Sequence, residues 1–239
     1  MSREQELLTA LRSCGRELEK GFAFEAFAEA SRLTWELFVQ EPVEISQDTF
    51  RFVSCQEVEA AAERQIEGDL RRRYALLPDD VREKLSFEKM VQHECFGFAG
   101  FFLAINSGTT IGVYNHQEDR CYVLDTPTEK WRQYPYKFRP MIAVHELAHQ
   151  WVTKKRASLG LRYLGAAYWE EKFCVLIEAS LQGCAFWDNA SEKFLSSRRK
   201  ELQDLTPYLF DHVSEKLRYR NFIADCRHIC SQNHSEGDC

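Results

Sequence analysis

Apolar and charged residues alternate at helical spacing through the first forty residues, where the apolar positions recur every three or four residues between about 4 and 40. This pattern predicts one or two amphipathic helices. The segment 43–53 partly alternates between apolar and polar residues, as a half-buried strand does. Ser54, followed three residues later by Glu57, has the spacing of a capping box at the start of a helix. We therefore expect a strand and then helices over about 55–74 and 81–92.

The middle of the chain has a different pattern, in which aromatic and aliphatic residues form the run 97–106 and predict a buried strand. Two shorter apolar segments, 109–114 and 120–124, follow and are separated by a polar turn, so a meander of up to three strands is expected. Pro140 suits the first turn of a helix because proline has no N–H to leave unpaired. Helices are expected over about 140–156, 166–186, 190–205 and 207–225.

These elements contain no internal repeat and no clear interdomain linker. The fold class that they predict is α+β, as a single domain over residues 1–239. Its expected parts are a helical N-terminal part of about 1–92, a core of about 97–185 with a small antiparallel sheet, and a helical C-terminal part of about 190–239. About 90 residues would then be enough for the core.

Composition narrows the classes of partner and compartment. The 239 residues are 44% hydrophobic and 28% charged, which is typical of a globular chain. A formal net charge of -6 gives no overall attraction to nucleic acid or to an anionic membrane surface. The nine cysteines are an odd number, which fits free thiols in a reducing compartment. The N-terminus has no apolar stretch of signal-peptide length, so we expect a cytoplasmic protein.

The strongest chemical signal is the run His145-Glu146-Leu147-Ala148-His149. Two histidines four residues apart on a helix lie on one face, so both imidazoles can bind one Zn²⁺, with Glu146 within reach of an activated water. The other faces of this helix are apolar, which predicts that it is buried. Because buried histidines and a buried glutamate need partners, a metal ion is expected there. The chemistry that follows is metal-assisted hydrolysis, with Glu146 as general base and acid.

A catalytic zinc needs a third protein ligand. The next helix carries acidic residues, of which Glu171 and Glu178 are seven apart and share one face. Glu170 points about 100° away from that face by the helical repeat. The residues alone leave the choice between Glu171 and Glu178.

The run HELAHQW, followed about twenty residues later by an acidic helix, resembles the gluzincin clan of zinc metallopeptidases. The resemblance implies a zincin-like core and Glu171 as third ligand, with Cys174 as the small residue where the two helices touch. It also implies a hairpin before the active-site helix whose edge strand pairs with an extended peptide substrate. Two family features are missing: the element that grips a free amino terminus, and an asparagine or aspartate four residues after the third ligand, where Val175 stands.

Weaker signals have ordinary explanations. Tyr208 and His212, four apart on a C-terminal helix, could donate to a developing oxyanion, although they also fit an amphipathic helix. The tail residues Cys226, His228, Cys230 and His234 have soft-ligand chemistry and suggest a second, structural zinc, but their spacing is not that of a standard finger, so a frayed cysteine-rich tail is the preferred expectation. His93 and His116 are isolated and are expected at the surface or in loops.

The sequence therefore predicts a cytoplasmic zinc peptidase with one catalytic Zn²⁺ held by His145, His149 and Glu171, acting on a peptide or protein and on neither nucleic acid nor membrane. The alternative is a non-catalytic regulatory or interaction protein on the same scaffold, with or without metal. A third hypothesis is a purely structural zinc that joins the two helices, so that chelation would unfold the chain.

Overall fold

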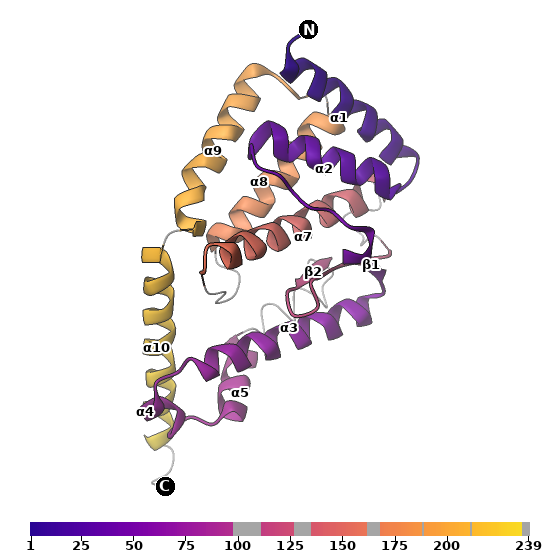
Figure 1. Ribbon diagram of the computed structural model, residues 1–239. Coiled ribbons are helices and arrows are strands. Elements are labelled where there is room, and N and C mark those ends of the chain that lie inside the picture. The colour runs from indigo at the N-terminus through magenta and orange to yellow at the C-terminus, as the bar shows by residue number, and fades with distance from the viewer. Residues whose placement is uncertain (98–110, 127–134, 162–167, 188, 211, 236–239) are drawn as a thin grey trace.

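The chain is mostly helical, with one small sheet, in a computed structural model (Figure 1). The structure describes residues 1–97, 111–126, 135–161, 168–187, 189–210 and 212–235. Within these ranges the helices are α1 (Arg3–Lys20), α2 (Phe24–Phe38), α3 (Cys55–Ala75), α4 (Asp79–Arg82), α5 (Phe87–Gly97), α7 (Pro135–Ser158), α8 (Tyr168–Ala185), α9 (Glu192–Phe210) and α10 (His212–Ser235), with a 3-10 turn η1 (Gln47–Thr49).

The sheet has three strands in the order β1-β3-β2, where β1 is Phe50–Val53, β2 is Gly112–Asn115 and β3 is Arg120–Leu124. β2 and β3 form the predicted antiparallel hairpin. The expectation of a wholly antiparallel sheet is wrong, because β1 pairs with β3 in parallel. Parallel neighbours need a long crossover connection, and this one includes α3, α4 and α5.

The sheet lies between α7 on one face and α3 on the other (Figure 1). α8 packs against α7, and the α1–α2 hairpin packs on α8 and α7 from the opposite side to the sheet. These elements share one large apolar cluster, which includes the fully buried side chains of Trp35, Phe138 and Ile177. The N-terminal helices are therefore part of the core that carries α7.

A second, smaller apolar cluster joins the end of α3 to α4, α5 and α10. Leu70, Leu85 and Met90 are buried in it, together with Cys226 and Cys230 from α10. The prediction of a frayed cysteine-rich tail is wrong up to residue 235, because α10 continues to Ser235. Two cysteines spaced four apart lie on one helical face and serve as small apolar residues here.

Several predicted boundaries need correction. The helix that was expected from Pro140 begins at Pro135, so that Pro140 lies inside α7. Pro135 itself takes the favourable first position, which removes the reason to begin the helix at Pro140. The helix expected over 81–92 is two helices, α4 and α5, and Ser86 caps the second by accepting from the N–H of Lys89. α5 continues to Gly97, where a strand was predicted, and the rest of that predicted strand lies outside the described residues.

The capping box at the start of α3 is present as predicted, since the Ser54 hydroxyl accepts from the Glu57 N–H and the Glu57 carboxylate accepts from the Ser54 N–H. The strand predicted over 43–53 is shortened to β1, which follows the η1 turn. Among the described residues, no helix is long and apolar enough to cross a bilayer.

Candidate metal centre

α7 carries both histidines of the HELAH run on one face. The apolar positions around them are fully buried, including Val144, Leu147 and Val152. The helix is fixed between the sheet and α8 by these contacts, so His145 and His149 are held one turn apart with ring centroids separated by 5.2 Å. Because the flanking apolar residues are buried, α7 cannot turn about its axis, and the face that carries the two imidazoles has a fixed direction.

The carboxylate of Glu171 lies opposite both imidazoles. Its two oxygens are 3.5 Å from Nε2 of His145 and 3.3 Å from Nε2 of His149. Glu171 is near the start of α8 and its side chain is 53% exposed, so the group of three is open to solvent on the Glu171 side. Of the two glutamates that the sequence left as alternatives, Glu171 is the one that meets the Nε2 atoms.

Two further carboxylates meet the Nδ1 atoms of the same rings. Glu178 lies 3.3 Å from Nδ1 of His145, and Glu170, which is only 1% exposed, lies 2.8 Å from Nδ1 of His149. A carboxylate has no proton to give, so each Nδ1 donates to its glutamate, and in the neutral ring that a metal ion requires the lone pair is then on Nε2. This is how outer carboxylates orient metal-binding histidines in proteins.

The positions of Glu178 and Glu170 both differ from what the sequence indicated. Glu178, an alternative third ligand in the sequence, contacts Nδ1 of His145 and not Nε2. Glu170 was set aside because it points about 100° from the face of Glu171, yet it also reaches α7. Adjacent residues on α8 lie on either side of the line of contact with α7, and a glutamate side chain is long enough to reach across. Because the two helices cross, both glutamates can reach α7, and the spacing of residues along α8 alone does not reveal this.

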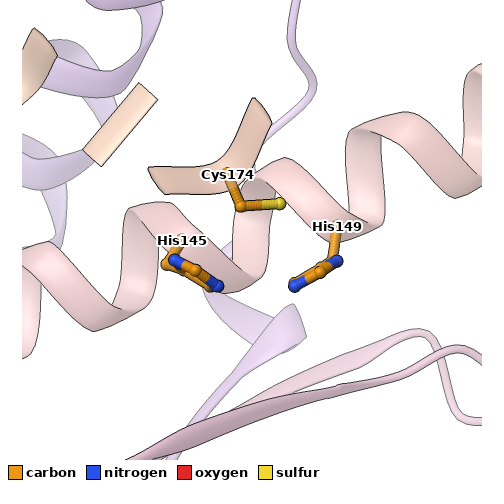
Figure 2. Close-up of side chains that lie close together, drawn as sticks. All are labelled: His145, His149 and Cys174. Carbon is orange, nitrogen blue, oxygen red and sulfur yellow. The ribbon is translucent and has the colours of Figure 1, made fainter. Parts of the chain in front are cut away.

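Cys174 also belongs to this centre. Its side chain is fully buried on α8, one turn after Glu171. The ligand atoms of His145, His149 and Cys174 all lie within 4.8 Å of one another, a grouping that could hold a metal ion. Figure 2 shows one ring nitrogen of each imidazole pointing into the space between the rings, with the sulfur of Cys174 directed into the same region from α8.

The pKa values of the histidines and of Glu171 are shifted by the contacts between them. Burial disfavours the charged form of His145, but Glu171 and Glu178 outweigh burial and raise its pKa to about 10. The pKa of His149 is likewise raised against the effect of burial, by Cys174, Glu170 and Glu171. Glu171 has a lowered pKa, because the two histidines outweigh its own desolvation. Carboxylates therefore surround a position that favours positive charge.

The Glu146 side chain lies on the side of α7 that faces the sheet, close to Gly112 of β2. It is 6% exposed, and burial raises the pKa of its carboxyl, with the two histidines partly offsetting the effect. The backbone N–H of Tyr114 in β2 donates to it. Gly112 makes this approach possible, because a Cβ there would lie 2.7 Å from Glu146 Oε1 and 2.5 Å from Ile142 Cγ2.

β2 is the edge strand next to this carboxylate. The N–H of Leu124 donates to the carbonyl of Ile111, which makes these two residues a hydrogen-bonded antiparallel pair. Hydrogen bonding alternates along such a ladder, so the backbone groups of Gly112 and Tyr114 are directed away from β3. Among the described residues, no strand pairs with this outer edge of β2.

The other candidate residues lie elsewhere. Tyr208, at the end of α9, is 48% exposed and stacks on the ring of Trp169 with centroids 4.7 Å apart. Among the tail residues, Cys226 and Cys230 are buried in the second apolar cluster and His228 contacts Gln232. His116 lies in the turn between β2 and β3, which is one of its two expected positions, but its side chain is only 2% exposed and its Nε2 is 2.8 Å from Asp69 Oδ1. His93 is exposed, as expected. The side chains of His212 and His234 lie outside the described part of the structure.

Comparison with known proteins gives no relative from which a function could be transferred. No protein-family model matches the chain, and no curated protein and no solved structure is significantly similar to it. What the centre can do therefore follows from its own side chains: two histidines, a thiol and surrounding carboxylates that could hold a metal ion.

Proposed function

We propose that this protein is a zinc-dependent peptidase whose catalytic ion is held by His145, His149 and Glu171. The observation that supports it best is the approach of one carboxylate to both Nε2 atoms, at 3.5 and 3.3 Å. Ligands about a tetrahedral zinc, at bonds of roughly 2.0–2.1 Å, are separated by roughly 3.3–3.4 Å. The two distances from the Glu171 carboxylate to the imidazoles thus match the separation of neighbouring zinc ligands.

The donor chemistry also fits zinc. Two neutral imidazoles and one carboxylate form a set that catalytic zinc sites use, with a fourth position left for water or substrate. Glu178 and Glu170 hold the two rings in the tautomer that presents Nε2 to the ion. A bound zinc ion would lower the pKa of water toward about 7 and polarise a substrate carbonyl.

Glu146 is the proposed general base and acid. It follows His145 directly on α7, and its raised pKa, caused by burial, favours a group that can both take and return a proton. The N–H of Tyr114 fixes one side of its carboxylate, so the proton is accepted on the other. Glu146 then passes that proton to the leaving amine, while His145, His149 and Glu171 keep their positions.

The proposed substrate is a peptide or protein segment in extended conformation. The outer edge of β2, next to Glu146, offers the backbone groups of Gly112 for pairing with such a segment. A net charge of -6 argues against nucleic acid or an anionic membrane as the partner. The seven cysteines whose side chains the structure describes are free, which supports a reducing compartment, and we place the reaction in the cytoplasm.

The test is hydrolysis of a peptide library, with products identified by mass spectrometry, by the wild-type protein and by Glu146→Gln. We expect one zinc per chain in both proteins and cleavage by the wild type alone. His145→Ala should lose both zinc and cleavage. A wild type that binds zinc and cleaves nothing would instead favour the interaction protein, and unfolding on chelation would favour the structural zinc. Absence of stoichiometric zinc would contradict the proposed site itself.

A further inference from the structure

Cys174 occupies a position at the centre that the proposed hydrolysis does not use. It lies on the same helix as Glu171, one turn further on, and it is fully buried. Its sulfur and one ring nitrogen of each histidine all lie within 4.8 Å of one another. Figure 2 shows this sulfur beside the gap between the two imidazoles, so the thiol lies where a further metal ligand would be.

We propose that Cys174 is a fourth protein ligand, which closes the centre in its resting state and has to leave before hydrolysis. This inference rests on the proposed zinc site. It assigns the centre two states, one with His145, His149, Glu171 and Cys174 around the ion, and one in which water or substrate takes the place of the thiolate. The protein would then regulate its own activity through one side chain.

The geometry allows this with a small movement. In a tetrahedral site, a sulfur at roughly 2.3 Å from zinc lies roughly 3.6 Å from a nitrogen ligand. The sulfur of Cys174 lies within 4.8 Å of both histidine nitrogens, so a shift of about an ångström at most is enough. Glu171 already has the spacing of an inner ligand, at 3.3 and 3.5 Å. Glu171 thus already lies at ligand spacing, and Cys174 is the group that would have to shift to close the centre.

Closing the centre exchanges one ligand for another. The S–H bond breaks, the sulfur donates its electron pair to the ion, and the proton and the displaced water pass to bulk solvent. Thiolate is a soft ligand that zinc binds well, and the fully buried side chain faces little competition from solvent. With four protein ligands the ion has no open position for an activated water, as in structural zinc sites.

Cobalt substitution tests the ligand directly. Co²⁺ bound to a thiolate has a sulfur-to-metal charge-transfer band in the near ultraviolet, besides the visible d–d bands of any tetrahedral site. We expect the wild-type protein loaded with one Co²⁺ to show both kinds of band. Cys174→Ser and Cys174→Ala should lose the charge-transfer band and keep the visible bands. Cys184→Ala should have the spectrum of the wild type. Cys184 is a matched control, because it is a second fully buried cysteine on α8.

Peptide hydrolysis by the zinc forms tests the resting state. Cys174→Ala lacks the closing ligand, so its turnover should exceed that of the wild type. The increase should be roughly tenfold if the closed state of the wild type is about ten times as populated as the open one. Unchanged or lower turnover in Cys174→Ala would overturn the closing role, even with the band present.

The outcomes separate this inference from the proposed function. Visible cobalt bands without a charge-transfer band, together with cleavage that depends on Glu146, would overturn the role of Cys174 and leave the peptidase intact. A charge-transfer band that survives in Cys174→Ala would show that another cysteine binds the metal, which also overturns it. A protein that binds no cobalt or zinc would overturn both.

Discussion

At the residue scale, the centre depends on how each histidine uses its two nitrogens. Nε2 of His145 and of His149 faces Glu171, whereas Nδ1 faces Glu178 or Glu170. An imidazole held from both sides cannot rotate without losing a contact to a carboxylate. The charges that orient the rings are also what would raise the basicity of the Nε2 lone pairs toward a metal ion.

Glu170 provides a direct test of this orientation. Glu170→Gln keeps the size of the side chain and an oxygen that can accept from Nδ1 of His149, but removes the negative charge. We expect the affinity for zinc to fall by about tenfold or more, as it does when an outer carboxylate is lost in other sites. Competition with a chromophoric chelator measures this. Glu192→Gln, an exposed change on α9, is the control, and equal affinities in the two variants would contradict the role of Glu170.

The dependence on pH follows from the raised pKa of His145, which moves from an ordinary 6.5 to about 10 in the metal-free protein. A raised pKa means that the protonated ring stabilises the fold fully below pH 6.5, and that this contribution is lost as the pH rises through 10. Zinc needs the neutral ring, so it has to displace the proton in this window.

Metal-free protein should therefore become less stable between pH 6.5 and 10, whereas the stabilisation that zinc adds should grow over the same window. Thermal unfolding with and without zinc, at a series of pH values, measures both trends. Calorimetry in two buffers of different ionisation enthalpy should also detect at least one proton released per zinc bound. A stabilisation by zinc that does not change with pH would contradict the assignment of His145.

At the scale of elements, the centre is a crossing of α7 and α8 with β2 packed beneath. The sequence predicted both helices and the hairpin, because their apolar periodicity is strong and does not depend on distant partners. It did not predict that Glu170, Glu171 and Glu178 would all reach α7, since that depends on the angle and depth at which the helices pack. Nor did it predict the parallel pairing of β1, which joins residues about seventy positions apart.

Gly112 tests the contact between β2 and α7. Gly112→Ala would bring a Cβ to 2.5 Å from Ile142 Cγ2 and 2.7 Å from Glu146 Oε1, so either the strand or the glutamate has to move. We expect a loss of about 1–3 kcal/mol in the free energy of unfolding and a loss of hydrolysis per folded molecule. Denaturant unfolding and peptide cleavage measure the two effects.

Gly160→Ala is the matched control for that experiment. Gly160 has a φ of +68° in open space after α7, so alanine there should cost about 1 kcal/mol through backbone strain alone. Its hydrolysis per folded molecule should remain that of the wild type. If Gly112→Ala behaved in the same way, the close packing of β2 on Glu146 would be unimportant for the site.

At the scale of the whole molecule, the helix that carries the candidate metal centre is supported by the N-terminal part of the chain. Trp151 on α7 packs edge-on against Trp35 of α2, with ring centroids 6.3 Å apart, and its Nε1 donates to the carbonyl of Pro42. Lys155 pairs with Glu41 beside it. The prediction that about 90 residues would be enough for the core did not foresee that α1 and α2 share its apolar cluster.

Truncation tests this dependence. Removal of residues 1–40 takes away α1 and α2 and would expose the faces of α7 and α8 that they cover, so we expect loss of cooperative unfolding and of zinc binding. Removal of residues 212–239 takes away α10, which contributes to the second apolar cluster, and should lower stability but keep zinc. Far-UV circular dichroism on heating and zinc content measure both. An N-terminal truncation that retains zinc would contradict the shared core.

The sequence by itself determined the pair of histidines with Glu146 between them, because a five-residue run on one helix fixes their relative direction through the helical repeat alone. Only the tertiary structure decided which carboxylate meets which nitrogen, and that Cys174 and β2 complete the centre. These contacts join separate elements, whose crossing and depth are set by how apolar side chains across the whole chain pack together. The packing depends on all of these helices and strands together, so it cannot be derived from the spacing of residues within one segment.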